Sequence, residues 1–162
     1  MLTAQAIIDK LQLEPLEREG GMFRSTYRSP HMIGEKHAGN AIYYLLAGKA
    51  FSHLHRLPTD EMYHFYLGDP VELLELFPDG TSRKVILGPD LLNGQEVQVV
   101  VRAGSWHGSK LVDGGRFALM GTNMSPGFSP GDYEHAQAEE LLALYPDQAE
   151  MIRKLCGKTS YR

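Results

Sequence analysis

Residues 48–68 read GKAFSHLHRLPTDEMYHFYLG and contain three of the seven histidines of the chain, His53, His55 and His64. His53 and His55 are two positions apart, so on an extended strand both side chains would leave by the same face. The proline-containing segment that follows predicts a turn, after which Glu61 opens the next strand. Two antiparallel strands joined in this way would bring two imidazoles and a carboxylate onto one wall. First-row divalent metals take this ligand set, and so does a general base with its orienting partner.

The residues around this cluster supply further candidates. Tyr63 shares the strand face of Glu61, where a tyrosine near a histidine could act as general acid; a hydroxyl merely satisfied at the rim of the fold is the plainer alternative. His64 would leave by the opposite face and contact a ligand or a partner chain. Ser52 and Asp60 are polar neighbours that could contact a ligand.

The composition is that of one soluble domain, residues 1–162, with 43% hydrophobic and 22% charged residues. A formal charge of −4 argues against a nucleic-acid polymer as partner, because such binders usually carry a basic face. No apolar run approaches the roughly 20 residues of a membrane helix, and the first ten residues lack the pattern of a signal peptide. A single cysteine, Cys156, excludes an internal disulfide and fits a cytoplasmic location.

Turn signals divide most of the chain into short strands without intervening helices, a pattern that predicts an all-β sandwich or barrel. A short amphipathic helix is expected before the strands, over residues 3–11, and helical segments after them, over 138–145 and 147–155. The strands are expected over 22–29, 41–46, 71–77, 83–87, 95–102 and 116–122.

A second histidine motif, Gly104-Ser105-Trp106-His107, places an imidazole just after a glycine turn. His107 could complete the site begun by His55. Trp106 is either core packing or one wall of a pocket, where an indole suits a planar or sugar ligand. Earlier in the chain, Glu19-Gly20-Gly21 predicts a turn in which Glu19 is either a cap or a pocket residue.

The two blocks together resemble the conserved motifs of the cupin superfamily. The first block has the form G…HxH…E…G and the second the form G-x-x-H. LEPLEREGGMFRSTYRS, AIYYLL, SHLHRLPTDEMYHFYLGDPVEL, AGSWHG and the late PGF, DYE and LLALYP segments also resemble, in this order, one particular family. It is the RmlC-like cupin family of unknown function, called the fifth cupin family, and the resemblance spans nearly the whole chain. The motif residues are Gly48, His53, His55, Glu61 and Gly68, then Gly104 and His107.

This resemblance implies a cupin double-stranded β-helix, an antiparallel jelly-roll barrel, and a homodimer. It also implies a barrel-mouth site that often holds a divalent metal, here through His53, His55, Glu61 and His107. Two departures stand out: five residues rather than three or four separate His55 from Glu61, with Asp60 at the usual spacing, and Leu111 replaces a frequent asparagine.

Two classes of function follow from the resemblance. As an enzyme, the protein would be an isomerase or epimerase of a sugar or nucleotide-sugar, with His55 as base, Glu61 or Asp60 as its orienter and Tyr63 as acid. A metal-dependent enzyme would use the four metal-ligand candidates instead. The alternative is a non-catalytic module that binds a small metabolite for sensing or storage.

Overall fold

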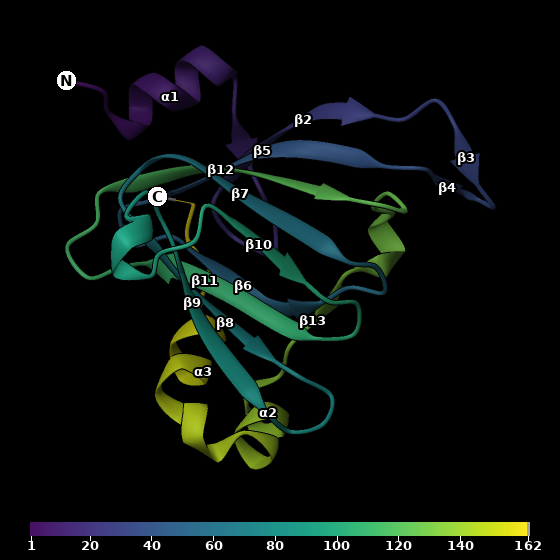
Figure 1. Ribbon diagram of the computed structural model, residues 1–162, viewed down its shortest axis with the longest axis vertical. Helices are drawn as coiled ribbons and strands as arrows, with labels where there is room; N and C mark the ends of the chain where they lie inside the picture. Colours follow the sequence, from purple (N-terminus) through teal and green to yellow (C-terminus); the bar gives the residue numbers. More distant parts are fainter. Residues whose placement is uncertain (162) are drawn as a thin grey trace.

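The computed structural model describes residues 1–161 as two sheets that face each other, with helices outside them (Figure 1). The strand pairs within both sheets are antiparallel, which confirms the expected all-β jelly roll with its N-terminal and C-terminal helices. Across the first sheet lie β1 (Glu14–Pro15), β2 (Met22–Arg28), β5 (Asn40–Ala47), β12 (Phe117–Met124), β7 (Glu61–Gly68) and β10 (Gln98–Val101). Across the second lie β13 (Glu134–His135), β6 (Phe51–Arg56), β11 (Trp106–Leu111), β8 (Val71–Leu76) and β9 (Ser82–Leu87).

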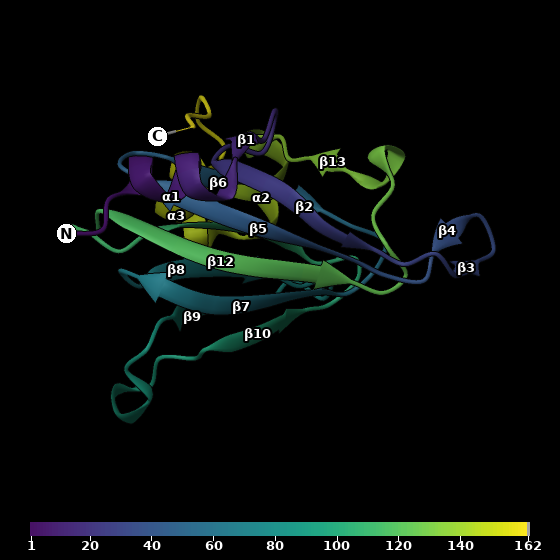
Figure 2. The same ribbon diagram turned by 90° about the horizontal axis from the view of Figure 1, so that it is seen from above.

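The remaining elements lie outside the two sheets. A hairpin of β3 and β4 projects away from the barrel (Figure 2). No helix within residues 1–161 is long and apolar enough to cross a membrane. The elements outside the two sheets are α1 (Ala4–Leu11), β3 (Met32–Ile33), β4 (Lys36–His37), α2 (Ala138–Leu144), α3 (Ala149–Leu155) and the 3-10 turns η1 (Leu91–Asn93), η2 (Pro130–Asp132) and η3 (Pro146–Gln148).

Three apolar layers hold the fold together, and each fully buried large side chain stabilises it by about 1.5–3 kcal/mol. The central layer fills the space between the sheets and includes Leu46, Leu73, Leu87, Val101 and Met120. A second layer joins α1 to the outside of the first sheet through Ile7, Ile8, Leu45 and Leu119. The third joins α2 and α3 to the outside of the second sheet through Leu54, Leu74, Trp106, Leu141, Ile152 and Leu155.

One irregularity in β6 decides which of its side chains face the barrel interior. The register of the β6–β11 pair shifts by one residue between Ser52 and His55, so Gly108 of β11 opposes both His53 and Leu54. The extra residue forms a β-bulge. Ser52 and His55 consequently share the inner face although three positions separate them.

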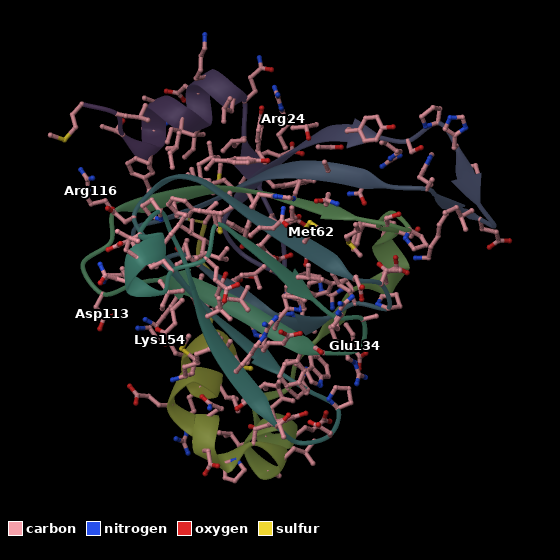
Figure 3. All side chains as sticks on the ribbon, viewed as in Figure 1. Arg24, Met62, Asp113, Arg116, Glu134 and Lys154 are labelled. Atoms are coloured by element: carbon pink, nitrogen blue, oxygen red, sulfur yellow. The ribbon has the colours of Figure 1, made fainter. Side chains whose placement is uncertain are left out.

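The barrel has two distinct ends. Figure 3 shows Glu134 near one end and Arg116 near the other. Glu134 pairs with Arg56, the neighbour of His55, in the β13–β6 ladder. The candidate site therefore lies at the end of the barrel marked by Glu134.

Candidate functional site

Three buried side chains from three strands converge inside the barrel: His55 of β6, Glu61 of β7 and His107 of β11. One ligand atom from each lies within 4.8 Å of the other two. The Nε2 of His107 is 2.9 Å from the Oε2 of Glu61, and the rings of His55 and His107 have centroids 4.1 Å apart. The two sequence motifs thus meet in space as the resemblance implies.

The ring of His55 is held in a defined orientation. Its Nδ1–H donates a hydrogen bond to the carbonyl oxygen of His53 at 2.7 Å, so the lone pair of the neutral ring resides on Nε2, toward the cluster. Burial, followed by the proximity of His107, holds the pKa of His55 well below its usual range. Burial alone would lower the pKa of His107 as well, but the hydrogen bond and charge of Glu61 outweigh burial and raise that pKa. The site therefore combines a neutral His55 with a His107 that is hydrogen-bonded to Glu61.

A pocket of about 290 Å³ opens beside this cluster. The buried side chains of His55 and Glu61 contribute to its inner wall, and its other walls are mostly apolar. The pocket is lined by Leu16, Glu17, Arg18, Glu19, Phe23, Asn40, Ile42, His55, Leu57, Glu61, Thr122, Met124, Phe128, Pro130 and Tyr133.

A second carboxyl, that of Glu19, enters the pocket from the turn between β1 and β2. Its Oε1 accepts a hydrogen bond from the Ser52 hydroxyl at 2.8 Å, and its Oε2 lies 4.0 Å from the Nε2 of His55. Burial, with the nearby charge of Glu61, raises the pKa of Glu19 to about 8. The turn that carries it is strained, since Arg18 adopts a φ of 67°, in the region that favours glycine.

Tyr133 and Arg18 also line the pocket, and sequence reasoning missed both. The ring of Tyr133 stacks on His55 with centroids 5.1 Å apart, and the Arg18 guanidinium lies 4.8 Å from the centroid of the same tyrosine ring. Tyr133 belongs to the irregular connector after β12, and folding brings this segment back to the barrel end. Tyr133 belongs to the DYE segment, which the sequence links only to the family resemblance.

His53 does not join the cluster, which corrects its assignment beside His55 on one strand face. Its ring stacks on His135 with centroids 3.7 Å apart, and its Nδ1 is 2.8 Å from the carbonyl oxygen of Leu54. His53 and Leu54 form the β6 bulge opposite Gly108, so the two-residue spacing from His55 no longer implies a shared face.

Trp106 also lies away from the pocket. It packs among the side chains that join the second sheet to α2 and α3, with the Arg56 guanidinium 4.5 Å from the centroid of its ring. Consecutive residues of a strand point to opposite faces, so the inward direction of His107 sends Trp106 outward. Of the two interpretations, core packing is the one observed.

Tyr63 and Ser52 face the barrel interior but do not line the pocket. Tyr63 is only 1% exposed, and burial, with the charges of Glu61 and Glu19, raises its pKa well above the usual range. Ser52 is fully buried behind Glu19, to which it donates its hydrogen bond. Any contact of Ser52 with a ligand would therefore run through Glu19.

His64 leaves the sheet on the face opposite Glu61, as alternation predicts. Its Nε2 is 2.7 Å from the Oδ1 of Asn123, and the side-chain amide of Gln98 lies 3.1 Å from its Nδ1. These partners come from the neighbouring strands β12 and β10. His64 thus ties three strands together outside the barrel and is not among the residues that line the pocket.

Asp60 holds a loop and does not reach the pocket. Its Oδ1 accepts a hydrogen bond from the backbone N–H of Ala103 at 2.8 Å, and its Oδ2 accepts one from the Arg102 guanidinium at 2.8 Å. The Ala103 bond first, and then Arg102, hold the pKa of Asp60 below its usual value. Of the two neighbouring acidic residues, Asp60 therefore stabilises the loop, whereas Glu61 faces the barrel interior.

Replacing Asp60 by alanine should lower the free energy of unfolding at pH 7 by about 1 kcal/mol, because both hydrogen bonds are lost. A carboxyl whose pKa is lower in the folded state stabilises the protein above its usual pKa, and this contribution disappears as the pH falls through the folded value. The difference from wild type in urea denaturation should therefore shrink between pH 7 and pH 3. An equal difference at both pH values would contradict this role, and Glu35→Ala at an exposed turn is the control.

Two facing antiparallel sheets that hold a His, Glu and His cluster at one end define a cupin. The chain belongs to the family described as Cupin superfamily (DUF985), whose model matches residues 5–136. The sequence-based family assignment is therefore confirmed. No curated protein shows a significant match to the chain.

Solved structures agree with this assignment. A Shewanella oneidensis protein is 36% identical, with a TM-score of 0.90 over 97% of this chain and 99% of its own. A hypothetical protein from Leishmania major is 30% identical, with a TM-score of 0.88 over 99% and 100% of the two chains. A mutant of Bacillus subtilis oxalate decarboxylase is 16% identical, with a TM-score of 0.58 over 93% of this chain and 39% of its own, a likeness of fold alone.

Proposed function

We propose that this cupin is a metal-dependent enzyme acting on a small organic molecule, with His55, Glu61 and His107 as the metal ligands. The convergence of their three ligand atoms within 4.8 Å carries this proposal. Two imidazoles and a carboxylate suit a first-row divalent ion, and three protein ligands leave positions open for a ligand of the metal. When bound, such an ion would polarise an oxygen atom of the substrate.

The chain's own residues support metal binding at this place. The His53 carbonyl fixes the His55 ring so that the unprotonated Nε2 faces the cluster, as a metal-binding imidazole requires. The carboxylate of Glu61 lies beside His107 and would balance part of the charge of a divalent ion. All three residues are buried, which would limit the number of water molecules that compete with them for an ion.

The pocket favours a small substrate with an apolar part. Its volume of about 290 Å³ is at the lower end of the range for sites that bind drug-sized molecules. Phe23, Ile42, Met124 and Phe128 supply apolar walls, and Arg18 is the one arginine or lysine among its lining residues. A nucleotide-sugar would need more space and more cationic groups for its phosphates, so a smaller molecule fits better.

An isomerase-like reaction without metal is the second candidate, and the buried hydrogen bond between His107 and Glu61 favours it. In this version the base would be Glu61, which lines the pocket, with His107 as its hydrogen-bonded partner, rather than His55 as expected from the sequence. Incubating candidate hydroxy-ketones in D₂O with metal-free protein would reveal it as deuterium incorporation next to the carbonyl. Exchange that requires added metal would instead support the metal-dependent function.

Elemental analysis of the purified protein, followed by calorimetric titration with Zn²⁺, Mn²⁺ and Fe²⁺, tests the metal-dependent function. We expect one ion per chain and a higher unfolding temperature when the ion is added, because a ligand that binds only the folded state stabilises it. Protein that contains no metal and gains no stability from any added ion would contradict the proposal.

A further inference from the structure

Glu19 is a polar side chain that lines the pocket but is not one of the proposed metal ligands. The backbone carbonyl of Glu19 accepts a hydrogen bond from the N–H of His53 at 2.8 Å, which fixes the turn on β6. The turn that carries the Glu19 carboxyl is therefore hydrogen-bonded to β6, the strand that also carries His55.

The two oxygen atoms of Glu19 have different surroundings. Oε1 is fixed by the buried hydroxyl of Ser52 at 2.8 Å. Oε2 lies 4.0 Å from the Nε2 of His55, too far for a hydrogen bond between them. An oxygen atom of a ligand, about 2.8 Å from Oε2, would fit beside His55. The carboxyl is thus anchored by Ser52, with Tyr44 as a further neighbour, and its Oε2 lies on the side of His55.

The charges around the pocket restrict what that ligand group can be. A ligand carboxylate would meet the carboxylate of Glu61 in the same enclosed space, and like charges there are unfavourable. A ligand ammonium would enter past the guanidinium of Arg18. A neutral hydroxyl avoids both conflicts, and it can donate to a carboxylate or accept from a protonated carboxyl.

From this geometry we infer that Glu19 recognises a hydroxyl group of the ligand, and that the pocket takes small hydroxylated molecules whose remaining atoms are largely apolar. The hydroxyl binds Oε2 of Glu19 beside His55, while the apolar part contacts Phe23, Ile42, Met124 and Phe128. The inference deepens the proposed function and rests on its premise that the pocket binds a small organic molecule. It does not require that the metal be present.

A matched pair of probes, para-fluorobenzyl alcohol and para-fluorotoluene, tests this inference by fluorine NMR titration of the purified full-length protein. The two probes share shape and differ in one hydroxyl. Wild type should bind the alcohol about tenfold more tightly, as one hydrogen bond to an ionisable group allows. Equal affinities, tighter binding of the toluene, or no binding of either probe would overturn the inference.

Variants then locate the preference at Glu19. Glu19→Gln keeps a group that hydrogen-bonds a hydroxyl and should retain the preference, whereas Glu19→Leu should abolish it while still binding both probes. Glu14→Leu, an exposed position on the adjoining strand β1 and outside the pocket lining, is the matched control and should behave as wild type. If Glu19→Leu does not fold, Ser52→Ala replaces it, and loosening the anchored carboxyl should reduce the preference. A preference unchanged in the folded Glu19 or Ser52 variants would place hydroxyl recognition elsewhere.

The same samples separate this inference from the proposed metal site. Zn²⁺ titration of wild type should show binding whether or not the probes discriminate. Zn²⁺ binding without hydroxyl preference would refute the role of Glu19 and leave the metal site standing. Hydroxyl preference without Zn²⁺ binding would refute the metal site and leave the role of Glu19 standing.

Discussion

Replacing His55 or His107 by alanine is expected to weaken Zn²⁺ binding by more than about 100-fold, since even indirect supports of metal ligands are worth 10- to 100-fold. Each substitution removes one of three ligand atoms that lie within 4.8 Å of one another. The remaining two ligands could still bind a metal weakly, but not with the affinity of the full set. Calorimetric titration of wild type and the two variants, each checked for folding by circular dichroism, measures the effect.

His53→Ala is the matched control for this experiment. His53 is as buried as the two proposed ligands and belongs to the same strand as His55, but its ring stacks on His135 outside the cluster. The variant should therefore bind Zn²⁺ almost as tightly as wild type. A loss of affinity as large as that of His55→Ala would show that His53 is a ligand after all and that the bulge does not separate the two histidines.

Gly108→Ala is expected to have the second large effect, a loss of about 2–3 kcal/mol in the free energy of unfolding. A Cβ on Gly108 would lie 2.7 Å from the carbonyl oxygen of Ser52 and 3.1 Å from the backbone nitrogen of Leu54. Both atoms belong to the backbone of the bulged strand and cannot move aside as a flexible side chain would. Urea denaturation at neutral pH measures the loss.

Gly131→Ala provides the comparison, because a Cβ at Gly131 would meet no atom within 4 Å. Its free energy of unfolding should stay within about 0.5 kcal/mol of wild type, as for most surface substitutions. Equal stability of the two variants would mean that β6 does not approach Gly108 closely. The explanation for the inward placement of Ser52 and His55 would then be wrong.

The strand pattern predicted an all-β sandwich or barrel from local properties, namely turn residues and alternation. The resemblance to the cupin motifs added the jelly roll and grouped His55, Glu61 and His107, together with His53, in one site. The spacing of five residues between His55 and Glu61 proved compatible with the cluster, because Asp60 is bound by Arg102 and Ala103 at the turn. Glu61 is left free to face inward.

The errors arose where distant segments decide the local geometry. The bulge at His53 depends on Gly108, which is far along the chain, so the HxH spacing could not reveal it. The pocket position of Glu19 depends on the contact of its turn with β6, and that of Tyr133 on the return of the chain after β12. Homodimer formation and a cytoplasmic location stay predictions, and light scattering would test the first.

Crystals of the protein grown with Zn²⁺ and measured at the zinc absorption edge test the central claim most directly. The anomalous difference map should show one strong peak about 2.0–2.2 Å from the Nε2 atoms of His55 and His107 and from a carboxylate oxygen of Glu61. The three ligand atoms lie within 4.8 Å of one another, so small side-chain shifts would bring them around one ion once coordination replaces the hydrogen bond between His107 and Glu61. A map with zinc only at surface residues, and with the His107–Glu61 hydrogen bond intact, would contradict the claim.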